Sequence, residues 1–217
     1  MRRRTITRSR LQAEEVTSVA PQHRVELVTF TYAPGHQWRP FHIADCMNSY
    51  RKQAARDGHP FRYEWVAELQ LKRMRRRSES AAECLHYHAI VWSLPGYSYP
   101  HPDSRGWWPH GMTNVEIAHN PVGYLAKYAS KGGSIEALEQ LPRRARISGG
   151  GGLSEGGRQL ASWWLRPRYV REAFPDFIDQ VRRAVGGGWV NRSTGELVAA
   201  PVFDWKCPSY GNSQEER

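Results

Sequence analysis

The fold is decided by residues 84–92, which read Cys-Leu-His-Tyr-His-Ala-Ile-Val-Trp. The second half of this stretch is rich in β-branched and aromatic side chains, which are typical of a buried strand. Residues two apart in a strand point to the same face, so we expect His86 and His88 to project side by side. Two neutral imidazoles at that spacing are good ligands for a divalent transition metal. An isolated His-x-His on a sheet face is more often without function, so the interpretation depends on a second motif.

That second motif is residues 120–133, which read Asn-Pro-Val-Gly-Tyr-Leu-Ala-Lys-Tyr-Ala-Ser-Lys-Gly-Gly. Asparagine can cap a helix, proline suits its first position, and Gly132 or Gly133 can take the left-handed conformation that ends one. At about 100° per residue, one face of this helix carries two phenols and two ammonium groups, from Tyr124, Lys127, Tyr128 and Lys131. The plain alternative is an amphipathic helix with a solvated polar face. A Tyr-x-x-Lys that is repeated in register with itself favours a functional role.

A His-x-His strand followed by a Tyr-x-x-Lys helix resembles the HUH endonucleases, which initiate rolling-circle replication. The doubled motif is most similar to the initiators of single-stranded-DNA bacteriophages and related prophages. The resemblance covers roughly residues 24–133. It implies an α+β fold of the ferredoxin-like or RRM-like kind, in which helices flank an antiparallel sheet. We expect a small, mostly helical C-terminal extension to follow.

The resemblance also implies a divalent metal ion, Mg or Mn, bound by His86, His88 and a third ligand from the paired strand. Glu68 is the expected third ligand because apolar residues flank it in a predicted strand. Glu64 and Gln70 share its face and remain alternatives. Cys84 also lies on the face of the histidines, and a thiolate there would favour zinc. Three successive ligands on one strand would surround an ion poorly, so Cys84 carries less weight.

In this family a tyrosine hydroxyl attacks the DNA backbone and forms a 5′-phosphotyrosine link. The resemblance therefore implies catalytic roles for Tyr124 and Tyr128 as nucleophiles, and for Lys127 and Lys131 beside them. The partners implied are a single-stranded replication origin and the helicase and polymerase of the host. Two other classes of protein remain open. One is a non-catalytic single-strand-binding or regulatory protein, and the other is a metal-dependent hydrolase that forms no covalent intermediate.

The remaining pattern divides the chain into three parts. Residues 1–20 are expected as a basic flexible arm, 21–133 as the endonuclease domain and 134–217 as an accessory region. Within the domain, hydrophobic periodicity predicts strands over 24–32, 61–73 and 112–118 and a helix over 41–57. Beyond it, the sequence predicts a short helix over 134–141, a flexible glycine joint over 147–152, a helical segment over 169–185 and a hairpin over 188–198.

Composition favours a nucleic-acid partner. Lys and Arg total 31 against 21 acidic residues, a formal charge of +10. Such a surplus is typical of proteins that bind polyanions. Arg75, Arg76 and Arg77 in a predicted loop, and Trp107 and Trp108 in another, are the expected DNA contacts. Of the two tryptophans, one is expected to cover the core and the other to stack on a base. The three cysteines form no Cys-x-x-Cys pair, which favours the cytoplasm of a bacterial host, and no apolar run has the length of a membrane span. His101, His110 and His119 have no ligand spacing and are expected to be ordinary.

Overall fold

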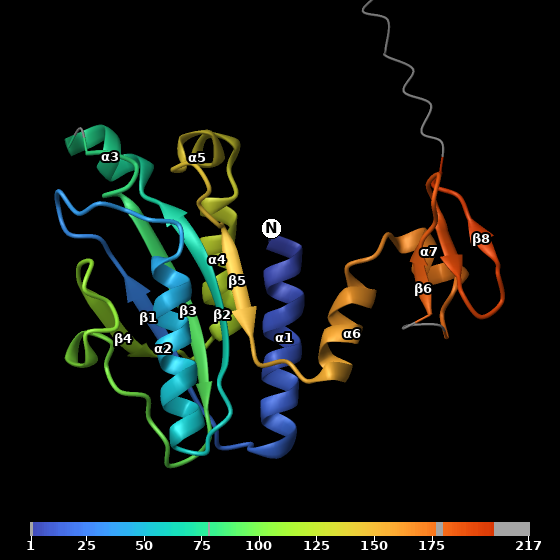
Figure 1. The fold of residues 1–217 in the computed structure, drawn as a ribbon, viewed down its shortest axis with the longest axis horizontal. Coiled ribbons are helices and arrows are strands. Elements are labelled where there is room, and N and C mark those ends of the chain that lie inside the picture. Colours follow the sequence, from blue (N-terminus) through green and yellow to red (C-terminus); the bar gives the residue numbers. More distant parts are fainter. Residues whose placement is uncertain (1, 78, 177–179, 202–217) are drawn as a thin grey trace, which may run out of the picture. The chain divides into compact units, whose positions relative to one another are not determined.

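The computed structural model describes residues 2–77, 79–176 and 180–201, and these divide between Leu165 and Arg166 into two compact units (Figure 1). None of the described helices has the length and apolar character that a membrane crossing requires.

The first unit is built on a five-stranded antiparallel sheet with the strand order β4-β1-β3-β2-β5 (Figure 1). The strands are β1 (Arg24–Phe30), β2 (Arg62–Leu69), β3 (Leu85–Ser93), β4 (Thr113–Ile117) and β5 (Ser148–Gly151). β3 is central and buried along its whole length, as its run of apolar residues predicts. The predicted antiparallel α+β fold is confirmed.

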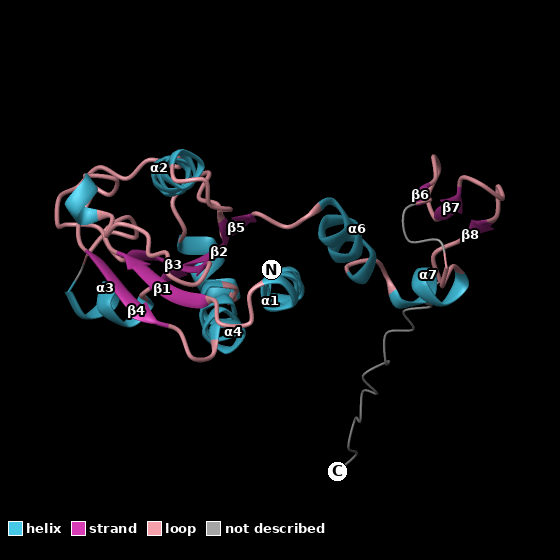
Figure 2. Cartoon of the chain, turned by 90° about the horizontal axis from the view of Figure 1, so that it is seen from below, coloured by secondary structure: helices cyan, strands magenta, loops and turns pink. Residues whose placement is uncertain are grey.

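Helices cover both faces of this sheet (Figure 2). α2 (His42–Arg56) lies on one face, where it packs with Tyr87 and Ala89 of β3. α1 (Arg2–Val19) and α4 (Pro121–Gly132) lie on the other, where they pack with the alternate β3 residues such as Ile90. Because side chains alternate along a strand, His86 and His88 face α4 and not α2.

The other elements are short. The first unit also contains α3 (Leu71–Arg77), η1 (Asp103–Arg105), α5 (Ile135–Gln140) and α6 (Glu155–Trp164), and the second contains α7 (Arg168–Ala173), β6 (Val181–Arg183), β7 (Trp189–Asn191) and β8 (Leu197–Val198). The predicted hairpin corresponds to the antiparallel pair β7 and β8. Residues 181–183, expected to be helical, instead form a strand against β7, and 177–179 lie outside the described residues.

Residues 2–19 form α1 where a flexible arm was expected. The buried side of this helix is largely polar and includes Thr5, Ser9 and Gln12. The side-chain amide of Gln12 donates to the carbonyl of Gly151 at 2.7 Å, and Arg8 Nε lies 2.6 Å from Glu64 Oε1. A helix held by polar contacts has no clear apolar stripe, so hydrophobic periodicity in the sequence does not predict it.

The glycine run over 147–152, expected to be a flexible joint, supplies the edge strand β5. Its glycines are required by close packing. A Cβ at Gly150 would lie 2.1 Å from the Glu64 carboxyl carbon, and one at Gly149 would lie 2.6 Å from the Trp65 ring. The side chains of β2 therefore occupy the space above and below the three glycines of β5.

The predicted strand over 61–73 ends early, at Leu69. The backbone N–H of Gln70 donates to the Cys84 carbonyl at 3.0 Å, and α3 starts at the next residue. The basic residues expected in a hairpin loop therefore lie on a one-to-two-turn helix.

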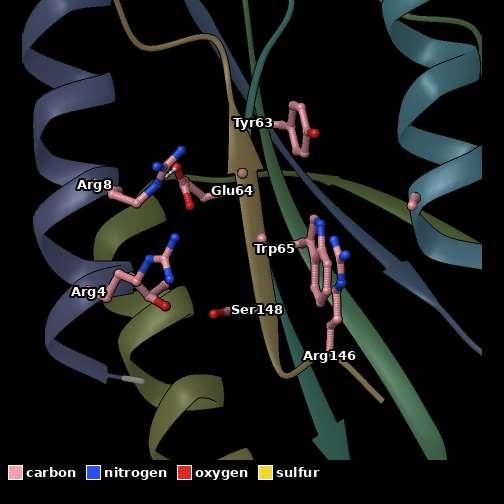
Figure 3. A pocket seen from close by; sticks show the side chains of 11 residues that line it. Arg4, Arg8, Tyr63, Glu64, Trp65, Arg146 and Ser148 are labelled. Carbon is pink, nitrogen blue, oxygen red and sulfur yellow. Dashed lines mark hydrogen bonds and ion pairs between the residues drawn. The ribbon is translucent and has the colours of Figure 1, made fainter. Parts of the chain in front are cut away.

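The buried carboxyl group of Glu64 makes the stability of the fold depend on pH. Its carboxylate points toward Arg8 in a pocket of about 390 Å³ between α1 and β5 (Figure 3). Burial raises the pKa of Glu64 to about 7, against the opposing effect of Arg8. The folded chain thus keeps a proton that the unfolded chain loses above about pH 4.5, so this group lowers stability as pH rises from about 4.5 to 7.

We expect Glu64→Gln to remove this dependence. Relative to the Gln variant, the wild type should lose up to about 3 kcal/mol of unfolding free energy between pH 4.5 and 7.5. Urea unfolding at a series of pH values measures the difference. Parallel pH profiles for the two proteins would contradict a raised pKa.

Candidate functional site

The two motifs meet where the middle of the sheet faces α4. In the antiparallel pairing of β2 with β3, Glu68 lies opposite His86 and Val66 lies opposite His88. The side chains of Glu68, His86 and His88 are all buried. Glu68 and both histidines thus share one face, as their spacing in the sequence predicts.

His88 is the best-anchored side chain of the site. Its Nε2 lies 2.9 Å from Glu68 Oε2, and its Nδ1 lies 3.1 Å from the Thr29 hydroxyl on β1. The ring of Tyr128 stacks on the His88 ring with centroids 3.6 Å apart and planes 8° from parallel. Contacts from β1, β2 and α4 therefore fix this imidazole in one orientation.

The two ring nitrogens of His86 differ in their hydrogen bonding. Its Nδ1 lies 2.9 Å from the side-chain nitrogen of Gln70. Its Nε2 is buried without a hydrogen-bond partner among the described residues. Burial, with a further contribution from His88, lowers the pKa of His86 to about 4, so the ring is neutral at pH 7. A buried and unpartnered imidazole nitrogen is costly unless it binds something.

Glu68 supplies negative charge between the helix and the strands. Lys131 Nζ lies 3.0 Å from Glu68 Oε1, opposite the oxygen that contacts His88. Burial acts to raise the pKa of Glu68, but hydrogen bonds from His88 and Lys131 outweigh it and hold the pKa below its ordinary value. The carboxylate is therefore anionic. Imidazole nitrogens and carboxylate oxygens are donor types that divalent cations such as Mn²⁺ or Mg²⁺ accept.

The other residues considered as metal ligands, Glu64, Gln70 and Cys84, have different contacts. Glu64 pairs with Arg8, away from the histidines. Gln70 contacts His86 and can orient that ring from behind, as an outer partner of a metal ligand does. The Cys84 thiol donates to Glu79 at 3.3 Å, and burial raises its pKa to about 11, so it is a protonated thiol.

α4 begins and continues as its sequence predicts. The Asn120 side chain accepts from the Gly123 N–H at 2.9 Å, and Pro121 occupies the first turn. Tyr128 is partly buried against the histidines, and burial together with Glu68 raises its pKa. Tyr124, one turn earlier, packs against the same apolar cluster. Lys127 Nζ lies 5.6 Å from the centre of the Tyr128 ring.

The end of α4 differs from the expectation of a left-handed glycine. Neither Gly132 nor Gly133 has a positive φ. Gly132 is needed for a different reason, because a Cβ there would lie 2.0 Å from the Ala67 carbonyl oxygen. The last turn of α4 thus rests directly on the backbone of β2, beside Glu68, and this contact sets the position of Lys131.

Gly132→Ala should therefore destabilise the fold, although Gly→Ala in a helix usually stabilises by up to about 1 kcal/mol. The clash is with backbone and cannot be relieved by a rotamer change, so we expect a loss of about 1–3 kcal/mol. Gly156→Ala in α6 is the matched control, since a Cβ there meets only the Ser154 hydroxyl at 4.0 Å. Thermal unfolding of both variants checks the prediction, and equal melting temperatures would contradict it.

The residues expected to contact DNA differ in their exposure and in their partners. Arg76 is exposed, whereas Arg75 pairs with Glu136 and Arg77 lies 3.7 Å from Glu79. Trp108 is only 2% exposed and donates its indole N–H to the Thr31 carbonyl at 2.9 Å. It is a core residue on the α2 side of the sheet and cannot stack on a base, contrary to the expectation.

Trp107 is half-buried, and its ring packs edge-on against Tyr50 with centroids 4.8 Å apart. The indole is therefore engaged within the molecule on the α2 side of the sheet. The sequence reasoning also missed a second group of polar residues on this side. His36, His42 and His110 gather there and could hold a metal ion.

An antiparallel sheet whose central His-x-His strand faces a Tyr-x-x-Lys helix is the arrangement expected of a replication-associated protein. The chain belongs to the ORF2 family of replication-associated proteins, a family of rolling-circle replication initiators, whose model it matches over residues 25–133. That match contains the whole of the site, from Thr29 to Lys131. Neither the curated proteins nor the solved structures contain a match to this chain.

Proposed function

We propose that this protein is a metal-dependent endonuclease and strand transferase that nicks single-stranded DNA at a replication origin through a 5′-phosphotyrosine intermediate. The observation that carries the proposal is the stacking of Tyr128 on His88, with ring centroids 3.6 Å apart. It places a phenol against a histidine whose other contacts are a carboxylate and a threonine hydroxyl.

His86, His88 and Glu68 would hold the metal ion. The unpartnered Nε2 of His86 and the anionic state of Glu68 support this assignment. When bound, a divalent ion polarises the scissile phosphate and offsets charge on its non-bridging oxygens. Mg and Mn both suit a site with a carboxylate, and the two imidazoles favour Mn.

The nucleophile in this proposal is a tyrosine hydroxyl of α4. The hydroxyl loses its proton and its oxygen forms a bond to phosphorus while the bond from phosphorus to the 3′ oxygen breaks. The 3′ oxygen takes up a proton. The products are a 5′-phosphotyrosine and a free 3′-hydroxyl. The ammonium groups of Lys127 and Lys131, which lie 5.6 and 5.7 Å from the centre of the Tyr128 ring, can stabilise the developing negative charge.

Two tyrosines one helical turn apart allow two successive cuts. We propose that Tyr128 makes the first link, because it already contacts His88, and that Tyr124 attacks the new strand while the first link persists. Each tyrosine then acts alternately as nucleophile and leaving group. Residues i and i+4 lie on the same side of a helix, so a small shift of the strand serves both.

The remaining basic residues would bind the DNA backbone. Arg4, Arg8 and Arg146 line the pocket between α1 and β5 (Figure 3), and Arg76 is exposed on α3. Phosphate contacts of this kind position a strand without reading its sequence. The 3′-hydroxyl product suits extension by a polymerase of the host, and separation of the strands would need a host helicase.

The test is covalent capture. Purified protein is mixed with a labelled single-stranded origin oligonucleotide and Mn²⁺, and the products are run on a denaturing gel. The proposal predicts label at the mass of the protein-DNA adduct, and mass mapping places it on the α4 peptide. A non-catalytic binder retains label only on a native gel, and a hydrolase cleaves without capture. Either of those results would overturn the proposal.

A further inference from the structure

Three histidines from separate parts of the chain converge on the α2 side of the sheet. His36 follows β1, His42 is the first residue of α2 and His110 lies just before β4. One ring nitrogen from each lies within 4.8 Å of the other two. None of these residues belongs to the site on the α4 side, because Tyr32, whose ring contacts all three, lies in the apolar cluster on the α2 side of the sheet.

The three rings contact one another directly. His42 and His110 stack with centroids 3.6 Å apart and planes 11° from parallel. His110 Nδ1 lies 2.8 Å from His36 Nε2. The nitrogens of a tetrahedral zinc site, each about 2.0–2.1 Å from the ion, are roughly 3.3 Å from one another. An imidazole binds a metal ion in the plane of its ring, so His42 or His110 must rotate out of their stack before all three nitrogens can bind one ion.

The backbone beneath the rings is fixed. The Ala33 N–H donates to the His110 carbonyl at 2.8 Å, and the His36 N–H donates to the Ala33 carbonyl at 3.1 Å. Gly111 permits this close approach, since a Cβ there would lie 2.1 Å from the Thr31 carbonyl oxygen. The Tyr32 hydroxyl lies 3.3 Å from His42 Nδ1, which resembles the outer partner that commonly orients a metal-bound imidazole.

We propose that His36, His42 and His110 form a zinc site that joins the segment after β1, the start of α2 and the segment before β4. Three imidazoles without a carboxylate favour a borderline-soft dication such as Zn²⁺ over Mg²⁺. Three protein ligands leave a fourth tetrahedral position for water. Because His36 and His110 are only half-buried, that position is within reach of solvent.

The surroundings are compatible with a bound cation. Burial lowers the pKa of His110 to about 4 and also lowers the pKa of His42, so both rings are in the neutral form that binds metals. The charged neighbours Arg39 and Asp45 act on His42 in opposite directions. A bound ion would link three segments that hydrogen bonds and packing alone now hold, and so would stabilise the folded state.

The test uses the full chain, stripped of metal and titrated with Zn²⁺ against a chromogenic chelator. The parent protein is His86→Ala/His88→Ala, in which the other candidate site cannot bind. We expect one zinc per chain in the parent. Adding His36→Ala should weaken binding by more than the roughly 10–100-fold that loss of an outer partner costs. Adding His101→Ala, an exposed histidine near η1, is the control and should change nothing.

A second measurement distinguishes loss of zinc binding from misfolding of the variant. In the otherwise wild-type chain, Zn²⁺ should raise the melting temperature, and His36→Ala should make that rise smaller while the circular dichroism of the folded state stays unchanged. Co²⁺ in place of zinc should give the intense visible absorption of a tetrahedral site, which His110→Ala should remove. If the parent binds no zinc, or the His36 and His110 variants bind it as tightly as the parent, the three histidines are only a hydrogen-bonded cluster and the proposal is wrong.

Discussion

A Tyr124→Phe/Tyr128→Phe variant should lose covalent capture of DNA completely, whereas each single variant should keep part of it. Phenylalanine preserves the ring that stacks on His88 and removes only the oxygen that attacks phosphorus. Tyr128→Phe should have the larger effect on the first cut, because the Tyr128 ring stacks on His88 of the site. Denaturing electrophoresis with labelled oligonucleotide measures capture, and joining of a second oligonucleotide measures strand transfer.

Tyr169→Phe, in the second unit, is the matched control and should behave like the wild type. Single-strand binding, measured by fluorescence anisotropy, should be similar for all of these proteins because no charge is lost. If one single change abolishes capture while the other leaves both nicking and strand transfer intact, the alternating mechanism is wrong and one nucleophile remains. If the double variant still captures DNA, neither tyrosine is the nucleophile.

His86→Ala/His88→Ala should abolish metal-dependent nicking and leave DNA binding largely intact. A metal Lewis acid contributes several kcal/mol to stabilising a phosphoryl transition state, which corresponds to a fall of about 10²–10⁴-fold in rate. Glu68→Gln keeps the hydrogen bond to His88 but removes the negative charge, so we expect weaker metal binding and an intermediate rate. Nicking at increasing Mn²⁺ concentration separates loss of affinity from loss of rate.

A chelator should reduce the wild type to the level of the double-histidine variant and should not affect that variant further. His101→Ala serves as the control for loss of an imidazole outside the site. Full nicking in the chelator, or by the double-histidine variant, would show that the metal role assigned to these residues is wrong.

The parts of the fold and site that could be predicted from sequence are those with a local periodic signal. The alternation of His86 and His88 with apolar residues placed them on one face of a central strand, and α4 begins at the expected cap and proline. Glu68 was preferred over Glu64 and Gln70 on the same strand face because apolar residues flank it, and its carboxylate lies 2.9 Å from His88. Each of these features depends on residues within a few positions of one another.

Features that depend on distant contacts could not be predicted. α1 is held by Gln12 and Arg8, which bond residues more than fifty positions away, so its buried side carries no hydrophobic pattern. His110 has no ligand spacing because its neighbours in space, His36 and His42, follow a different strand. Trp108 was expected at a DNA surface because it lies in a loop, but that loop folds back over the core.

The glycine strand β5 has a consequence for how the protein behaves at high concentration. An edge strand offers free N–H and C=O groups to a strand of another molecule, which is a common route to aggregation. β5 has only four residues, and the Gln12 amide already occupies the Gly151 carbonyl. With one serine and three glycines, it gives an incoming strand no apolar row to interlock with. This edge of the sheet packs closely against its own neighbours and is a poor template for pairing with another molecule.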